Sequence, residues 1–314
     1  MKCFWFITLS FLFALTACGQ ATTTPTATAL PTATPLPTIT PLPTATPLPT
    51  IQPGESTRTL QVGDLERTYI LHIPPGLDSQ YPVPLVFVFH GFSENAISIQ
   101  MLSGFNDISD TNTFILVYPN GVNRDWNLGG YPPLETGIDD FAFVRKMIED
   151  LGTIVRIDPK RIYSTGFSAG ANFSYRLACE MSDTFAAIAP MEGWLFTNPC
   201  QPQEPVAVFH VHGSEDAYEG QTVPMMANGV YVDVVFPPVE QAIATWVKLD
   251  GCNGAARIEK QGVVTQTVYP DCLAGTVVEL SVIDGGRHAW PSPYAFPSIS
   301  SQGIWDFFKA HPKP

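Results

Sequence analysis

Ser168 lies within the segment Gly-Phe-Ser-Ala-Gly of residues 166–170, which separates two runs of different character. Residues 161–165 are partly β-branched and typical of a short strand, whereas residues 171–181 are compatible with a helix. A serine flanked in this way by glycines is typical of a sharp strand-to-helix turn that exposes the hydroxyl. The helix N-terminus behind it favours developing negative charge. The pattern therefore predicts a nucleophilic serine.

Two later strand-like runs each end near a residue that could activate this serine. Residues 206–211 are typical of a buried strand and lead to Asp216. Residues 277–283 are typical of another strand and lead to His288. Serine, aspartate and histidine in this chain order are the triad order of α/β-hydrolases. We therefore expect His288 to act as the general base and Asp216 to orient it. Glu215 and Asp284 are the competing acids, but Asp284 stands too close to His288 in sequence to reach the far ring nitrogen.

The apolar run 85–89 leads into His90, Gly91 and Phe92. A turn after such a strand can supply a backbone N–H to a developing oxyanion. We expect the N–H groups of Phe92 and Ala169 to form this oxyanion hole.

No metal or organic cofactor is expected, because serine chemistry of this kind needs none. His210 and His212 stand two residues apart and would share one face of a strand, so they could form a metal pair. No third ligand is evident in the sequence, and the other histidines suit structural roles.

The first eighteen residues have the features of a processed leader. Lys2 precedes an apolar stretch that is too short to span a bilayer. The segment Leu-Thr-Ala-Cys of residues 15–18 resembles a bacterial lipobox, in which Cys18 becomes lipid-modified. An ordinary secretory signal is the alternative, and both predict export from the cytoplasm.

Residues 19–53 are expected to form an extended linker. They are rich in threonine and proline, carry no charge and repeat one eight-residue motif at 31–38 and 43–50. Such a segment has no large apolar face to bury. The catalytic domain would then span residues 54–314, tethered to a membrane only through the lipid anchor.

The formal net charge of the chain is −13, and nearly all of it falls in the expected catalytic domain. Without a basic stripe, nucleic acid is a poor partner. A strongly anionic polymer would also be repelled, whereas a neutral ester would not.

Four cysteines remain once Cys3 and Cys18 are assigned to the leader and the lipid. An even number in an oxidising compartment indicates disulfides. Of the three possible pairings we favour Cys179 with Cys200 and Cys252 with Cys272, because each closes a short loop; four free thiols are the alternative. No C-x-x-C spacing points to zinc.

The rest of the domain alternates strand-like and helix-like runs. Strands are expected at 67–73, 85–89, 114–118, 161–165, 185–189, 206–211 and 277–283, and helices at 139–154, 171–181, 239–249 and 304–310. Alternation of this kind predicts an α/β fold with a mostly parallel sheet covered on both faces.

With these residues placed, the domain resembles α/β-hydrolases of the carbohydrate esterase family 1 kind, in the group of feruloyl esterases and polyhydroxybutyrate depolymerases. The resemblance runs from about Arg67 to Phe308. It is carried by the segments 90–92, 118–121 with 126–127, 139–140, 166–170, 212–216, 250–252 and 285–291.

The resemblance implies an extracytoplasmic serine esterase that forms an acyl-enzyme. The substrate class would be feruloyl, acetyl-polysaccharide or polyhydroxyalkanoate esters, which include esters of polymers. The chain has Ala171 where the family often has glycine, and Asn120 where it often has an acidic residue, which leaves the substrate preference open. Trp126 and Trp290 are expected to line the acyl pocket, unless they are packing aromatics of a loop.

Two rival functions share this sequence pattern. A prolyl-oligopeptidase-like peptidase has the same fold and triad order, but no propeller-sized segment precedes this domain. A surface binding protein on an inactive hydrolase scaffold would have no need of all three triad residues.

Overall fold

The computed structural model describes residues 51–129, 136–227 and 230–314. The predicted leader with Cys18, and nearly all of the expected linker, lie outside the described residues. Within the described part of the chain, no helix combines the length and apolar character needed to cross a membrane.

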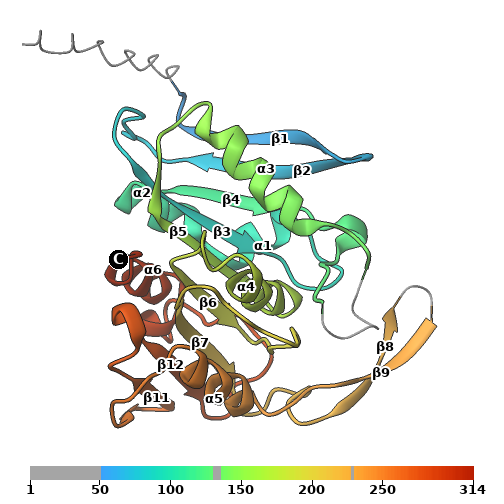
Figure 1. The fold of residues 1–314 in the computed structure, drawn as a ribbon, viewed down its shortest axis with the longest axis vertical. Helices are drawn as coiled ribbons and strands as arrows, with labels where there is room; N and C mark the ends of the chain where they lie inside the picture. Colours follow the sequence, from blue (N-terminus) through green and yellow to red (C-terminus); the bar gives the residue numbers. More distant parts are fainter. Residues whose placement is uncertain (1–50, 130–135, 228–229) are drawn as a thin grey trace, which may run out of the picture. The chain divides into compact units, whose positions relative to one another are not determined.

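A ten-stranded sheet forms the framework of residues 54–314 (Figure 1). Its spatial order is β1-β2-β4-β3-β5-β6-β7-β12-β11-β10. The six strands from β4 to β12 in that order are parallel, and antiparallel strands continue the sheet at both edges. The strands are β1 Gly54–Val62, β2 Leu65–Ile73, β3 Val83–Phe89, β4 Ile115–Pro119, β5 Ile157–Phe167, β6 Ala187–Met191, β7 Ala207–Gly213, β10 Arg257–Gln261, β11 Val264–Tyr269 and β12 Val278–Ile283.

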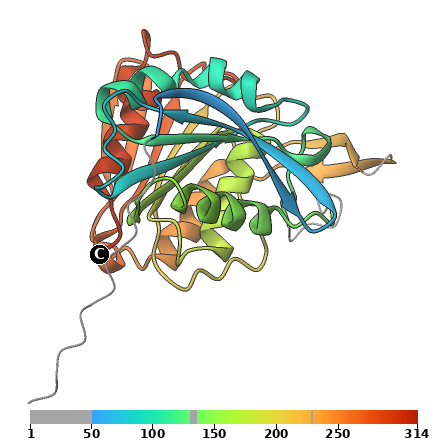
Figure 2. The same ribbon diagram turned by 90° about the horizontal axis from the view of Figure 1, so that it is seen from above.

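Helices cover both faces of this sheet (Figures 1 and 2). Side chains of α1, α2 and α6 share one buried apolar cluster with the sheet, while those of α3, α4 and α5 contribute to clusters on the other face. The mostly parallel α/β-hydrolase fold is therefore confirmed. The helices are α1 Ala96–Ser103, α2 Phe105–Asn112, α3 Asp140–Gly152, α4 Ala169–Glu180, α5 Val239–Leu249 and α6 Ser301–Ala310, with short 3-10 turns η1 Val122–Arg124, η3 Leu273–Gly275 and η4 Pro297–Ile299.

The central strands are continuous runs of buried residues because both of their faces are covered by helices. In β3 and β7 every residue is buried. The carboxyl ends of β3, β5, β6 and β7 lie next to one another in the sheet order. Loops that follow these four strands therefore meet at one edge, where ligands bind in open α/β sheets.

Both favoured disulfides are present in the structure. Cys179, near the end of α4, is bonded to Cys200, and Cys252, just after α5, is bonded to Cys272. Each bond ties a helix on one face of the sheet to a loop that leads into the next element.

A second, two-stranded sheet was not expected from the sequence. Strands β8 (Thr222–Ala227) and β9 (Val230–Val235) pair antiparallel and project from the main sheet (Figure 1). The structure also adds β1, β10, β11, α1 and α2 to the expected elements. This hairpin and the residue that follows it bring Met225 and Phe236 to a cavity at the carboxyl edge of the main sheet.

Candidate active site

Ser168 stands at the turn where β5 ends and α4 begins. Its backbone has φ 54° and ψ −115°, a strained conformation for a residue with a side chain. The glycines on either side are needed for packing. A Cβ on Gly166 would lie 2.7 Å from the carbonyl oxygen of Phe89, and one on Gly170 would lie 2.2 Å from the same atom. The close packing of β3 against the turn thus holds the half-buried Ser168 in place.

His288 and Asp216 meet at this edge although they follow different strands. The Nδ1 atom of His288 lies 2.6 Å from Oδ2 of Asp216, and the carboxylate is buried. Of the two competing acids, Glu215 and Asp284 are both exposed, and in the described part of the chain neither forms an ion pair with His288. The geometry therefore brings Asp216 to the histidine and leaves the competitors aside.

The environment of Asp216 favours its charged form. Burial by itself would raise the pKa of Asp216, but the hydrogen bond with His288 and a 2.9 Å hydrogen bond from the Tyr218 N–H act the other way. The charges of His288 and His212 act in the same direction, and the net result is a lowered pKa. A carboxylate is consequently available to hold the imidazole Nδ1–H.

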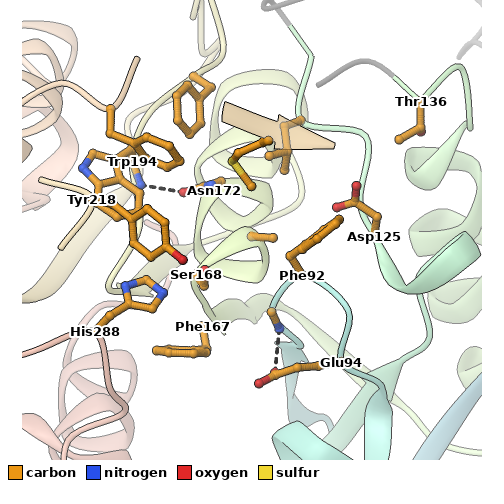
Figure 3. A pocket seen from close by; sticks show the side chains of 16 residues that line it. Phe92, Glu94, Asp125, Thr136, Phe167, Ser168, Asn172, Trp194, Tyr218 and His288 are labelled. Carbon is orange, nitrogen blue, oxygen red and sulfur yellow. Dashed lines mark hydrogen bonds between the residues drawn. The ribbon is translucent and has the colours of Figure 1, made fainter. Parts of the chain in front are cut away.

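Three aromatic rings surround the imidazole of His288. The ring of Phe167 has its centroid 4.9 Å away, that of Tyr218 5.1 Å away, and the indole of Trp194 is stacked at 6.0 Å. Because Phe167 immediately precedes Ser168, this packing holds the histidine beside the turn that carries Ser168. Ser168 and His288 both point into one cavity (Figure 3).

The loop after β3 forms another wall of the site. The side chain of Glu94 accepts a 2.9 Å hydrogen bond from the N–H of Gly91. The N–H of Phe92, by contrast, donates to no acceptor in the described residues. The N–H of Ala169 belongs to the first residue of α4, so it has no acceptor four residues earlier within that helix. These are the two donors that the sequence assigned to an oxyanion hole.

His90 anchors this loop from behind. It is fully buried, its Nε2 accepts a hydrogen bond from Gly121 N–H at 3.0 Å, and its Nδ1 lies 2.8 Å from the carbonyl oxygen of Gly91. Burial lowers the pKa of His90 to about 4, against the smaller raising effect of the Gly91 hydrogen bond. The ring is thus neutral and carries its proton on Nδ1.

The cavity between these walls has a volume of about 250 Å³ and is mostly apolar. Aromatic rings form much of its surface, with acidic groups at one side (Figure 3). Its described lining is Gly91, Phe92, Glu94, Asp125, Leu128, Thr136, Phe167, Ser168, Ala169, Asn172, Trp194, Phe196, Tyr218, Met225, Phe236 and His288.

The two tryptophans expected in the pocket lie elsewhere, which corrects that part of the prediction. Trp126 is 1% exposed, and its Nε1–H donates to the carbonyl oxygen of His90. Trp290 is 7% exposed and donates to the hydroxyl of Ser301. Each indole is buried, and its N–H is satisfied by an acceptor inside the protein.

Several residues that line the cavity were missed. Trp194 follows β6, Met225 belongs to β8, and Phe236 follows β9. Asp125 also lines the cavity, and burial raises its pKa to about 6 against the hydrogen bond from the Trp126 N–H. The dipeptide Asn-Gly at 228–229, followed by the valine-rich run 230–235, is a hairpin signal in the sequence that could have indicated strands β8 and β9.

His210 and His212 do share a strand face, but they are engaged in hydrogen bonds. His210 Nδ1 lies 2.8 Å from the hydroxyl of Tyr175, and its Nε2 lies 3.2 Å from Nδ1 of His212. In the described residues, His212, Glu192 and Asp216 place one polar atom each within 4.8 Å of one another. Asp216 already holds His288, so this group is part of the hydrogen-bonded site rather than a separate cluster.

Comparison with known proteins points to one group of enzymes. A family model described as Esterase PHB depolymerase matches residues 67–250. Feruloyl esterase B of Piromyces equi is 27% identical over 263 residues, which are 79% of this chain and 46% of that protein. The chain thus spans about half the length of that relative. Feruloyl esterase C of Emericella nidulans is 27% identical over 253 residues, or 78% of this chain and 84% of that protein.

A solved structure with the same fold is the acetyl xylan esterase from Aspergillus awamori. It has a TM-score of 0.58 and 16% sequence identity, and the match covers 81% of this chain and 99% of that one. At this identity the likeness shows the shared fold.

Proposed function

The chain belongs to the esterase family described as Esterase PHB depolymerase and is a carboxylic ester hydrolase, and from that premise we propose that it works through a triad of Ser168, His288 and Asp216. The observation that carries this proposal is the 2.6 Å contact between His288 Nδ1 and Asp216 Oδ2 at the cavity that Ser168 lines. The strained turn at Ser168 is the second support, because such strain is concentrated at functional positions.

The proposed reaction has two halves. His288 accepts the Ser168 proton while the hydroxyl oxygen attacks the ester carbonyl, and Asp216 stabilises the imidazolium that forms. The alcohol then leaves with the proton from His288. Water attacks the resulting acyl-enzyme by the same route and releases the acid. The N–H groups of Phe92 and Ala169 are the donors for the oxyanion in both halves.

We further propose that the acyl group carries an aromatic ring. The cavity is lined by six aromatic side chains besides His288, and two of its apolar residues come from the projecting hairpin region. A volume of about 250 Å³ lies below the usual range of roughly 300–1,000 Å³ for drug-sized ligands, so it suits one small acyl group rather than a polymer segment. The alcohol portion would remain outside, which leaves room for a feruloyl ester of a polymer.

The test compares Ser168→Ala with the unaltered protein on a panel of feruloyl, acetyl-xylan and hydroxyalkanoate esters. We expect the variant to lose turnover by several orders of magnitude on every ester, because only the hydroxyl is removed. Ser292→Ala, at an exposed position, is the matched control and should keep full activity. A variant that retained a tenth of the activity would rule out Ser168, and a preference for acetyl or hydroxyalkanoate esters would rule out the aromatic acyl group.

The location of the enzyme is a separate proposal. The lipobox ending in Cys18 and the uncharged spacer up to residue 53 support a catalytic domain of residues 54–314 that is anchored outside the cytoplasm. The two disulfides are consistent with an oxidising compartment. A bacterial lipoprotein anchor with several acyl chains would hold the protein firmly, whereas a single chain would not.

Cys18→Ala is therefore expected either to block maturation or to release the protein from the membrane fraction. Cell fractionation followed by an esterase assay measures this. Proteolysis between residues 21 and 53 should likewise free an active soluble domain, because every proposed catalytic residue lies beyond it. A Cys18→Ala protein that is exported and still sediments with membranes would contradict the anchor.

A further inference from the structure

Glu192 is a buried carboxyl directly behind the proposed triad. It follows the last residue of β6 and has an exposed fraction of 0%. Its backbone φ is 52°, a conformation uncommon for a residue with a side chain. Its N–H donates to the carbonyl oxygen of Val211, which ties the residue to the neighbouring strand β7. An ionisable side chain is thus held inside the protein by the backbone contact of Glu192 with the sheet.

The two carboxyl oxygens of Glu192 have different surroundings. Oε2 accepts a 3.0 Å hydrogen bond from the N–H of Gly213. Oε1 is buried and receives no hydrogen bond from any donor in the described part of the chain. An ionised carboxylate without further donors in such a place is strongly unfavourable, whereas the un-ionised acid has a proton of its own to donate.

The groups that face Glu192 offer little positive charge. Asp216 and Glu219 are both close enough to act on it as negative charges, and in the described residues no lysine or arginine pairs with it. His212 Nδ1 lies 3.8 Å from Oε2, but that nitrogen is already 3.2 Å from Nε2 of His210.

The other nitrogen of His212 faces away from Glu192. Its Nε2 lies 3.3 Å from Glu219 Oε2 and 3.5 Å from Asp216 Oδ2. Any charge on His212 is therefore directed to those two acids. A third carboxylate at Glu192 would add a negative charge that the cluster has no cation to balance.

We propose that Glu192 is an un-ionised carboxylic acid that donates a hydrogen bond to Asp216 and so positions that carboxylate toward His288. Asp216 then has three hydrogen bonds with distinct roles: the Tyr218 N–H fixes one oxygen, His288 engages the other, and Glu192 holds the carboxylate from behind. This role rests on the proposed function of Asp216. Glu192 touches no substrate in this arrangement and is a positioning residue.

The electrostatics of the site agree with this geometry. Burial is the largest cause that raises the pKa of Glu192, which reaches about 9. The Gly213 N–H opposes the rise, and the charge of Asp216, the hydrogen bond with Asp216 and the charge of Glu219 add to it. At neutral pH the proton therefore resides on Glu192, while Asp216, whose pKa is lowered, remains ionised.

The experiment uses two substitutions at Glu192 and one control. Glu192→Gln keeps a neutral group of the same shape that can donate to Asp216 and accept from Gly213. Glu192→Met keeps the approximate size but can do neither. Glu215→Gln removes a carboxylate at an exposed position beside Asp216 and serves as the control. For each, kcat and KM are measured on one ester as a function of pH.

We expect Glu192→Gln to keep kcat within about threefold, and Glu192→Met to lose tenfold or more in kcat with KM unchanged. The acid limb of kcat/KM, which reports the base in the free enzyme, should not move in Glu192→Gln, because no charge is removed. If Glu192 were ionised, the substitution would remove a neighbouring negative charge and lower the apparent pKa of that limb by about one unit. Such a shift, an equal loss of kcat in both variants, or full activity of Glu192→Met would overturn the proposal.

A second measurement is independent of catalysis. The infrared difference spectrum of the unaltered protein minus Glu192→Gln, recorded at pH 7, should contain the C=O stretch of an un-ionised carboxyl and lose it above pH 9. Carboxylate bands at pH 7 in its place would overturn the proposal. This readout holds even if Glu192→Met fails to fold or the roles of Ser168 and Asp216 prove wrong, so the two proposals fail separately.

Discussion

Strands β3 and β7 lie on opposite sides of β5 in the sheet, and each has a buried histidine at its carboxyl end. The two histidines serve opposite purposes. On one side, after β3, both ring nitrogens of His90 contact backbone groups, the carbonyl of Gly91 and the N–H of Gly121. On the other side, at the end of β7, the ring of His212 lies among carboxyl groups and a second histidine. A histidine thus fixes backbone groups as a neutral ring after β3, whereas at the end of β7 it lies within a cluster of charged groups.

This difference follows from what each side has to provide. A backbone N–H that stabilises an oxyanion needs a fixed position, and a neutral ring can fix it without a nearby charge. An imidazolium that forms during the reaction needs a negative charge close by, and that charge must itself be held. The site thus keeps its geometry on the β3 side and its charge on the β6 and β7 side.

The largest effect is expected where the charge is removed. Asp216→Asn should lower kcat by about 10³–10⁴-fold, because the amide no longer stabilises the imidazolium of His288 and can favour the wrong tautomer. Asp284→Asn is the matched control, since Asp284 is exposed and lies on the same edge of the sheet. Steady-state kinetics on one ester measure both.

Equal losses in Asp216→Asn and Asp284→Asn would break the comparison, because the charge would then not be concentrated behind His288. A loss confined to KM would do the same, since the charge is expected to act on the transition state. Thermal unfolding of both variants separates a kinetic effect from a loss of fold.

Local signals in the sequence were sufficient for the three triad candidates. Ser168 lies in a glycine-flanked segment typical of a tight turn, and Asp216 and His288 each follow a strand-like run. Parallel strands bring such ends to one edge of the sheet, so the assembly needed no information beyond the alternation of strands and helices.

Glu192 and Trp194 could not be found in this way. Glu192 follows a five-residue strand, and its burial depends on β6 lying between β5 and β7, which a single strand does not reveal. Trp126 and Trp194 are equally buried, and each indole N–H finds an acceptor, the carbonyl oxygen of His90 for Trp126 and the carboxylate of Glu219 for Trp194. Only Trp194 lines the cavity, and this depends on contacts between segments distant in sequence.

The smallest effect is expected on the β3 side of the site. It is a loss of folding stability as the pH becomes acidic. His90 has a pKa of about 4 in the folded protein against 6.5 for an unperturbed histidine, chiefly because of burial. Between these values the unfolded chain binds a proton that the folded chain does not, so stability falls as pH falls from about 6.5 to 4. The contribution of His90 is at most about 3 kcal/mol.

Urea unfolding at a series of pH values tests this with His90→Gln. The variant should be less stable at pH 7, because it loses one of the two backbone contacts, but its stability should decline less between pH 6.5 and 4.

Glu192→Gln is the matched contrast on the charged side. Because the pKa of Glu192 is raised to about 9, the unaltered protein loses stability as pH rises between about 4.5 and 9, and this substitution should remove that alkaline decline and leave the acid decline intact. If His90→Gln instead altered the alkaline decline, or if Glu192→Gln altered the acid decline, the two sides would titrate as one network. The distinction between a neutral His90 on one side and a cluster of charged groups on the other would then be wrong.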